Sequence, residues 1–169
     1  MRIFILGFMG SGKSTIGKKL AYRLNLPFYD LDRLIEQKYN ANLNEIFNTL
    51  GEDKFRLIEK NLLEEYLLKD NYVLSTGGGT PCFFNNMELI NKSGISVYLD
   101  TSIPIIVNRL MNAKRKRPLI SGMNKEQLEI FIKNKLTERT KFYKQAKITI
   151  PADNFKIQIL IELLKNAIN

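Results

Sequence analysis

Short apolar runs alternate along the chain with longer segments in which apolar residues recur every three or four positions. Five of the runs predict buried strands, at residues 2–6, 27–29, 72–76, 95–99 and 147–150. Helical periodicity predicts helices at residues 13–25, 31–39, 45–50, 52–69, from about 103, from 124 to about 146, and 154–167. Strands and helices that alternate in this way form a parallel sheet covered by helices on both faces. We therefore expect a three-layer αβα fold with a five-stranded parallel sheet.

Polar residues mark the ends of two predicted helices and one loop. Ser102 is expected to cap a helix that carries Pro104 in its first turn. Asn124, followed three residues later by Gln127, predicts a variant of the capping box at the start of a long helix. The segment at residues 112–124 is polar and basic and contains proline and glycine, so it predicts an exposed loop.

The length and the apolar pattern predict one domain over residues 1–169, because we find no repeat, low-complexity tract or linker. No apolar run approaches the ~20 residues needed to cross a bilayer, so we expect no membrane partner. The run at residues 2–6 is too short for a signal peptide and leads directly into a glycine-rich loop. Cys82 is the only cysteine, which suits a reducing cytoplasm.

The formal net charge of +9 changes this picture only slightly. A nucleic-acid partner is one explanation, but the aromatic residues do not alternate with the basic ones as a stacking surface requires. A general abundance of solvated lysines explains the charge better, and such a surface still attracts anionic nucleotides. The chain contains no histidine, so its chemistry must use carboxylates, Lys, Arg, hydroxyls or backbone groups.

Residues 7–14, GFMGSGKS, match the phosphate-loop pattern G-x-x-x-x-G-K-[ST] in full. Its glycines let backbone N–H groups point at an anion, and the following helix adds the positive end of its dipole. Lys13 is expected to reach the β- and γ-phosphates, and the Ser14 hydroxyl to bind Mg²⁺. The complete motif, placed between a predicted strand and helix, disfavours a glycine-rich turn that binds nothing. The residues expected to contact ATP are Gly10, Ser11, Gly12, Lys13, Ser14 and Thr15.

The destination of the phosphoryl group depends on other segments, because a small-molecule kinase needs an acceptor pocket and a lid that excludes water. The candidates are Asp30 with Asp32, Arg56 with Glu59, residues 77–79, residues 114–120, and Arg139 with Tyr143. Two aspartates at a strand end can face one crevice, where one holds Mg²⁺ through water and the other accepts or orients a hydroxyl proton. Taken singly, these segments also fit capping aspartates, a surface ion pair, a flexible turn, a solvated basic stretch and a surface helix.

Taken together, these motifs give the chain a resemblance to the shikimate kinase family along nearly its full length. The matching motifs, in the family's order, are the phosphate loop, D-x-D at Asp30 to Asp32, G-E-x-x-F-R-x-x-E at residues 51–59, G-G-G at residues 77–79, R-P-L at residues 117–119 and R-x-x-x-Y at Arg139 to Tyr143. Many enzymes share the phosphate loop, whereas the remaining set is much more specific. The resemblance implies a fold like that of P-loop nucleoside monophosphate kinases, with strand order 2-3-1-4-5.

The resemblance also implies a role for each acceptor residue. Arg56 and Arg139 would bind the carboxylate of shikimate, to which planar guanidinium groups are well matched. Asp32 would hydrogen-bond the ring hydroxyls, either taking the proton or only aiming the hydroxyl. The ring would also receive backbone N–H groups from Gly78 and Gly79. The acceptor-binding region would span about residues 31–60.

Further roles follow from the same resemblance. Glu59 would orient Arg56, and Asp30 would reach the Mg²⁺ ion through water. Arg117 would contact the transferring phosphate from a lid at about residues 112–124. The family's habit implies a monomer that phosphorylates the 3-hydroxyl of shikimate with ATP, on the pathway to chorismate and the aromatic amino acids. The remaining alternatives are another small-acceptor kinase, such as a gluconate or nucleoside monophosphate kinase, and a nucleotide-binding protein without catalysis.

The chain departs from the family's pattern where the adenine would bind. In the family, a basic residue after the fifth strand usually packs against the adenine. Residues 150–158 contain no arginine, and Lys156 does not match that position. Asn154 or Phe155 is the candidate in its place, and Arg109 is a candidate for the opposite side of the base.

Overall fold

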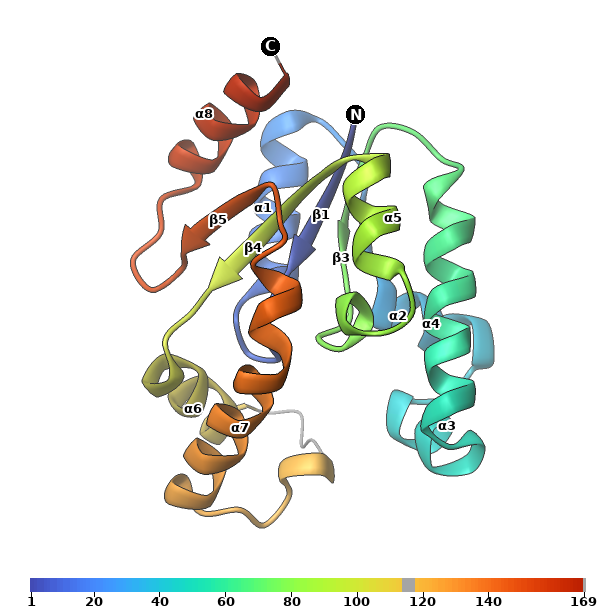
Figure 1. Cartoon of the computed structure of the whole chain (residues 1–169), viewed down its shortest axis with the longest axis vertical. Helices are drawn as coiled ribbons and strands as arrows, with labels where there is room; N and C mark the ends of the chain where they lie inside the picture. The colour runs from blue at the N-terminus through green and yellow to red at the C-terminus, as the bar shows by residue number, and fades with distance from the viewer. Residues whose placement is uncertain (114–117, 169) are drawn as a thin grey trace.

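A five-stranded parallel sheet forms the centre of the fold (Figure 1). The computed structural model describes residues 1–113 and 118–168. The strands are β1 (Arg2–Leu6), β2 (Phe28–Asp30), β3 (Tyr72–Ser75), β4 (Ile95–Asp100) and β5 (Ile148–Pro151). They lie in the order β2-β3-β1-β4-β5, and all four neighbouring pairs are parallel. The predicted fold class and strand order are therefore confirmed.

Helices follow the strands in turn, in nearly the predicted positions. They are α1 (Lys13–Leu24), α2 (Leu31–Tyr39), α3 (Leu43–Leu50), α4 (Glu52–Leu67), α5 (Asn86–Ser93), α6 (Ile103–Met111), α7 (Lys125–Tyr143) and α8 (Ile157–Ile168), with short 3₁₀ turns η1 (Thr80–Cys82) and η2 (Pro118–Ile120). None of these helices, within the residues described, has the length and apolar character needed to cross a bilayer.

Three details of the helices differ from the prediction. Helix α5 was not predicted, because the buried apolar side chains among its eight residues are only Met87 and Ile90. Helix α8 begins at Ile157, three residues later than expected, since Phe155 packs against the apolar core from the preceding loop. Ser102 stands at the N-cap of α6, but its side chain makes no capping hydrogen bond. Its backbone N–H donates to Asp153 Oδ1 at 2.9 Å instead. The capping box of Asn124 and Gln127 at α7 is present as predicted.

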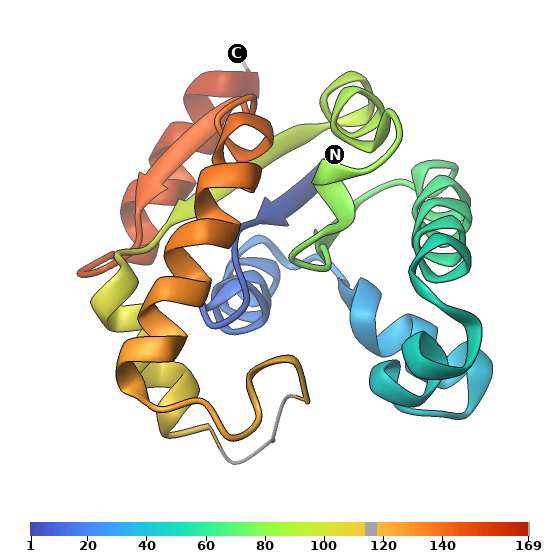
Figure 2. The same ribbon diagram turned by 60° about the horizontal axis from the view of Figure 1, so that its bottom comes forward.

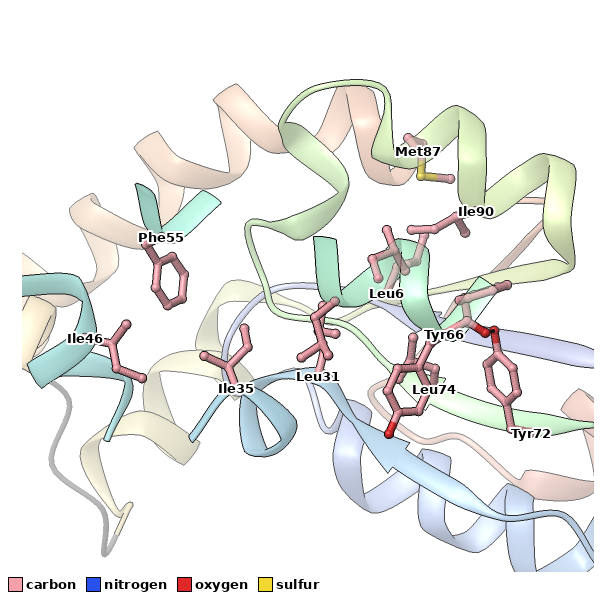
Figure 3. Packing of buried hydrophobic residues seen from close by; sticks show 13 residues of the cluster. Leu6, Leu31, Ile35, Ile46, Phe55, Tyr66, Tyr72, Leu74, Met87 and Ile90 are labelled. Atoms are coloured by element: carbon pink, nitrogen blue, oxygen red, sulfur yellow. Dashed lines mark hydrogen bonds between the residues drawn. The ribbon is translucent and has the colours of Figure 1, made fainter. Parts of the chain in front are cut away.

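Alternating side chains of the strands divide the core between the two faces of the sheet. Ile3 and Ile5 of β1 pack in a cluster with residues of α1 and α8. Phe4 and Leu6 point the other way and pack with residues of α2, α4 and α5. Figure 3 shows this second cluster, which extends from Ile46 and Phe55 at one end to Tyr66 and Tyr72 at the other. Helices therefore cover both faces, as a parallel sheet requires.

Two pairs of helices extend beyond the carboxyl ends of the strands. Helices α6 and α7 lie on one side of this edge and α2 and α3 on the other (Figure 2). The first pair has a small core of its own, formed by Phe8, Ile106, Val107, Leu110, Leu128 and Ile132. Because Phe8 belongs to the phosphate-loop motif, this core attaches the loop directly to α6 and α7.

Substitution of Leu63 by alanine tests the second core cluster, which contains Phe4 and Leu6. The Leu63 side chain is fully buried in α4, so its truncation removes apolar burial and leaves a cavity. We expect the free energy of unfolding to fall by about 2–5 kcal/mol. The matched control is Leu68→Ala at the C-cap of the same helix, where the leucine is 86% exposed and the expected change is below about 0.5 kcal/mol. Urea denaturation measures both, and equal changes would contradict the assigned packing.

Candidate functional site

A cleft of about 710 Å³ runs along the carboxyl ends of the strands. Its walls come from four parts of the chain: the phosphate loop with the start of α1, the β2–α2 junction, the end of β3 with the glycine loop, and α6 with the segment after β5. The lining residues are Met9, Gly10, Gly12, Lys13, Ser14, Thr15, Ile16, Lys19, Asp30, Asp32, Ser75, Thr76, Gly78, Arg109, Ala152, Asp153, Asn154, Phe155 and Ile157.

The phosphate loop connects β1 to α1 and has the backbone shape that its glycines predict. Gly10 and Gly12 have φ angles of 78° and 98°, a region that side-chain-bearing residues rarely adopt. Lys13 turns back over the loop, and its Nζ donates to the Phe8 carbonyl oxygen at 3.0 Å. The hydroxyl of Ser11 is buried without a hydrogen-bond partner among the residues described. The loop thus presents a cation and the N-terminal end of α1 to the cleft.

The Ser14 hydroxyl and the Asp30 carboxylate lie side by side at the β2–α2 junction. The Ser14 hydroxyl donates to Asp30 Oδ2 at 2.5 Å. Asp30 ends β2 and is also the N-cap of α2, where its other carboxylate oxygen accepts from the Arg33 N–H at 3.4 Å. A hydroxyl and a carboxylate side by side suit a hard cation such as Mg²⁺, which keeps several waters and binds few protein oxygens.

Asp32 reaches the cleft from the helix predicted at residues 31–39 and not from a strand end shared with Asp30. It lies in the first turn of α2, so the strand-end spacing proposed for Asp30 and Asp32 is wrong. The cap at Asp30 starts the helix immediately after β2, which leaves no extended residue beyond it. Both side chains nevertheless line the same cleft, as expected.

Charged side chains from three helices converge on the glycine loop of residues 77–79. A Cβ atom built on Gly77 would lie 2.8 Å from Asp32 Oδ1 and 2.5 Å from Glu59 Oε1. A Cβ atom on Gly79 would lie 2.7 Å from Arg56 Nη1, which only a shift of the arginine could relieve. The glycines are therefore required for close approach of α2 and α4 to this loop.

The ion pair of Arg56 and Glu59 is buried and is not the surface pair that a helix spacing of three residues allows. Arg56 is 9% exposed and Glu59 is 2% exposed. Glu59 accepts from Nη1 of Arg56 with one oxygen, and its other oxygen accepts from the Thr80 hydroxyl at 2.7 Å. Glu52 accepts from Nε and Nη2 of Arg56 at 3.3 and 3.2 Å. Several restraints thus hold this guanidinium group in one place.

Helix α7 brings Arg139 and Tyr143 to the other side of the glycine loop. A Cβ atom on Gly78 would lie 3.8 Å from Arg139 Nη1. The Tyr143 hydroxyl donates to the Gly78 carbonyl oxygen at 2.5 Å, and its ring stacks on Tyr98 with centroids 5.1 Å apart. Tyr143 is fully buried, and burial raises the pKa of its hydroxyl well above the usual value. The tyrosine is therefore a neutral donor that fixes the loop carbonyl.

Other candidates lie toward the far end of the cleft. Arg109 Nη1 donates to the carbonyl oxygens of Gly10 and Ser11 at 3.1 and 3.0 Å, beside the phosphate loop. Asn154 and Phe155 line the cleft together with apolar residues of α1 and α8. Arg117 lies outside the described residues, so the structure places only part of the segment at residues 112–124.

Sequence reasoning missed two residues that contact the charged side chains around the glycine loop. Thr80 binds Glu59, and the ring of Phe83 lies 4.2 Å from the guanidinium carbon of Arg56. Both follow the glycine loop directly, but neither residue type signals a charged partner. Only the position next to the G-G-G motif pointed to them.

Comparison with known proteins places these residues in a family. The family model described as "SKI: Shikimate kinase" matches residues 9–168. A shikimate kinase of Azobacteroides pseudotrichonymphae is 48% identical over 164 residues, which cover 96% of each chain. The crystal structure of shikimate kinase from Bacteroides thetaiotaomicron has a TM-score of 0.95 at 41% identity, covering 98% of each chain. Shikimate kinase from Acinetobacter baumannii in complex with shikimate has a TM-score of 0.85 at 33% identity, covering 99% of this chain and 92% of that one.

The reactivity of Cys82, the single cysteine of the chain, reports on burial and charge beside the glycine loop. Burial raises its pKa from 9.0 to about 11, and the nearby charges of Arg139 and Arg56 offset this only in part. At pH 8 the thiolate fraction is then about a hundredfold smaller than for a thiol of ordinary pKa. We expect iodoacetamide to label Cys82 about a hundred times more slowly in the folded chain than in urea at that pH. Similar rates in the two states would contradict the assigned burial.

Proposed function

The chain belongs to the shikimate kinase family, and we infer that it transfers the γ-phosphoryl group of ATP to the 3-hydroxyl of shikimate. The products are shikimate 3-phosphate and ADP, within aromatic amino acid biosynthesis. The observation that carries this inference beyond the family match is the convergence of Asp32, Arg56 and Arg139 on one glycine loop that lines the same cleft as the phosphate loop. The direct test is a coupled assay that measures ADP release from ATP with and without shikimate.

The phosphate-loop end of the cleft would hold the nucleotide. Backbone N–H groups of Gly10 to Thr15 and the start of α1 would receive the phosphates, and Lys13 would neutralise charge between the β- and γ-phosphates. We propose Mg²⁺ as the accompanying ion, with Ser14 as its ligand and Asp30 reaching it through water; the 2.5 Å contact of these side chains supports the assignment. The ion would supply charge stabilisation at the phosphates.

Arg109 would contact the nucleotide from α6. Asn154, with Phe155 beside it, would complete the adenine site, and their positions in the cleft wall support this assignment.

The glycine-loop end would hold the acceptor. Arg56 and Arg139 would bind the shikimate carboxylate with charged hydrogen bonds, and Gly78 and Gly79 would offer backbone N–H groups to the ring. Asp32 would accept a hydrogen bond from the attacking hydroxyl. Because phosphoryl transfer passes through a loose transition state, positioning and charge stabilisation would supply most of the rate.

The remaining assignments concern larger parts of the chain. We propose one kinase domain over residues 1–169, with an acceptor-binding region at about residues 31–60 and a lid at about residues 112–124. Arg117 would act on the transferring phosphate from this lid. We also propose a monomer located in the cytoplasm, which acts on small molecules and binds neither nucleic acid nor membrane.

Replacement of Lys13 by alanine is expected to lower kcat by about a hundred- to a thousandfold. The ammonium group stabilises charge that develops during transfer, and loss of one such contact costs about 3–4 kcal/mol. The fold should persist, because Lys13 is only half-buried at a loop edge. Lys18→Ala, an exposed lysine on the same helix, is the control and should leave kcat unchanged. If the Lys13→Ala enzyme kept more than about a tenth of the wild-type kcat, the assignment of the ATP phosphates to this loop would be wrong.

Replacement of Arg56 or Arg139 by lysine is expected to weaken acceptor binding selectively. Their proposed target, a carboxylate, keeps its charge during transfer, so the loss appears in KM and not in kcat. Lysine cannot present paired donors, and a charged hydrogen bond contributes roughly 1.5–3 kcal/mol. The KM for shikimate should therefore rise about ten- to a hundredfold, while the KM for ATP stays nearly constant.

Steady-state kinetics with each substrate varied in turn decides this prediction, with the exposed Arg23→Lys of α1 as control. If the variants weakened ATP and spared shikimate, the two arginines would face the nucleotide, and another nucleoside phosphate would be the better acceptor.

A further inference from the structure

We propose that Thr80 and Phe83 are positioning residues that set the plane of the Arg56 guanidinium group for recognition of the acceptor carboxylate. This inference rests on the proposed function. It concerns the short segment after the glycine loop, where η1 (Thr80–Cys82) is followed directly by Phe83. A carboxylate accepts two parallel hydrogen bonds from a guanidinium group only if the two groups are coplanar, so the orientation of Arg56 decides its use.

The guanidinium group of Arg56 lies over the ring of Phe83. The Arg56 Cζ atom lies 4.2 Å from the centroid of the Phe83 ring, well within the range of a cation–π contact. Phe55 lies farther away, at 5.4 Å. The backbone of Gly79 also approaches the group so closely that a Cβ atom there would lie 2.9 Å from Arg56 Cζ. Phe83 and Gly79 together restrict tilting of the guanidinium plane.

One edge of the guanidinium group is fixed through Thr80. The Thr80 hydroxyl donates to Glu59 Oε1 at 2.7 Å, and the other oxygen of Glu59 accepts from Arg56 Nη1. Thr80 is itself fully buried, and its carbonyl oxygen accepts from Asn86 Nδ2 at 2.8 Å. A continuous chain of buried hydrogen bonds thus runs from α5 through Thr80 and Glu59 to Arg56. The side-chain oxygens of Thr80 and Glu59 are paired in this network, whereas Asn86 Oδ1 at its α5 end is buried without a hydrogen-bond partner among the residues described. Buried networks hold their paired members rigidly.

The remaining partner of Arg56 differs from these restraints. Glu52 contacts Nε and Nη2, but its side chain is 52% exposed at the start of α4. Solvent and salt weaken a partly exposed ion pair of this kind, so it restrains the group less than buried contacts do. The buried hydrogen bond from Thr80 to Glu59 and the half-buried ring of Phe83 are therefore the restraints that we assign to the orientation of Arg56.

The neighbouring Phe84 offers a matched control. It has a φ angle of 52°, in the left-handed region. Its ring is 58% exposed and lies 5.3 Å from Lys60 Nζ, not against Arg56. Phe84→Leu therefore makes the same chemical change as Phe83→Leu, one residue along the chain and outside the acceptor end.

The test measures kcat, both KM values and the Tm for Thr80→Val, Thr80→Ser, Phe83→Leu and Phe84→Leu. We expect Thr80→Val and Phe83→Leu to raise the KM for shikimate about tenfold, with kcat and the KM for ATP within about twofold of wild type. Thr80→Ser keeps the hydroxyl and should restore the KM to within about threefold. Phe84→Leu should leave all values unchanged. An unchanged KM for shikimate in Thr80→Val and Phe83→Leu, or a parallel loss of kcat, both KM values and Tm, would overturn the proposal.

A double-mutant cycle then asks whether Phe83 acts through Arg56. In an Arg56→Lys background, Phe83→Leu should change the KM for shikimate less than twofold. An undiminished tenfold effect there would mean that Phe83 acts on the substrate directly, and the positioning role would be wrong.

A substrate-free measurement separates this proposal from the proposed function. The ring current of Phe83 should shift the ¹⁵N-detected Nε–H resonance of Arg56, assigned through Arg56→Lys. We expect Phe83→Leu, but not Phe84→Leu, to move this resonance. A wild-type enzyme inactive toward shikimate would refute the proposed function, whereas an unmoved resonance in Phe83→Leu would refute the positioning of Arg56.

Discussion

The glycine-loop end of the cleft depends on the lack of side chains at residues 77 and 79. Groups from α2 and α4 approach these two glycines to distances at which a single added carbon would collide with Asp32, Glu59 or Arg56, while Arg139 of α7 lies at contact distance from Gly78. Four charged groups can therefore surround a backbone segment that begins just after β3. The parallel sheet also determines where this loop lies, because it brings the carboxyl ends of β1, β2 and β3 to one edge.

Burial of Arg56 and Glu59 carries a desolvation cost, which makes the arrangement sensitive to substitution of either residue. Removing two charges from water costs several kcal/mol per ion, and only good geometry with additional hydrogen bonds compensates for it. Thr80, Glu52 and the Phe83 ring supply those additional contacts. The site therefore resembles a small polar core, whereas the phosphate-loop end relies on backbone conformation at Gly10 and Gly12.

Periodicity was sufficient for the five strands and for every helix except α5, and the glycine motif for the phosphate loop, because these are local properties of the sequence. The resemblance supplied the strand order and the set of acceptor residues. The helix predicted at residues 31–39 already included Asp32, but its capping by Asp30 was not predictable, because that cap depends on where β2 ends. Burial of Arg56 and the partners Thr80 and Phe83 were equally hidden, because they arise from contacts between α4 and a segment about 25 residues away. The short α5 has too few buried residues for a recognisable period.

Helix α7 gives the hydrogen bond of Tyr143 a mechanical consequence. Its C-terminal end is anchored by that bond to Gly78 and by the stack on Tyr98, while its other end follows the segment at residues 112–124. The helix has 19 residues and is about 28 Å long at ~1.5 Å per residue. The helix is thus a long rigid element that is fixed at the glycine loop by its C-terminal end. A rotation of the helix by about 5° about Tyr143 would displace Asn124 by about 2.5 Å, at ~1.5 Å of helix per residue. Because Leu128 and Ile132 of this helix share one core with α6 and Phe8, such a rotation would also displace α6 and the phosphate loop.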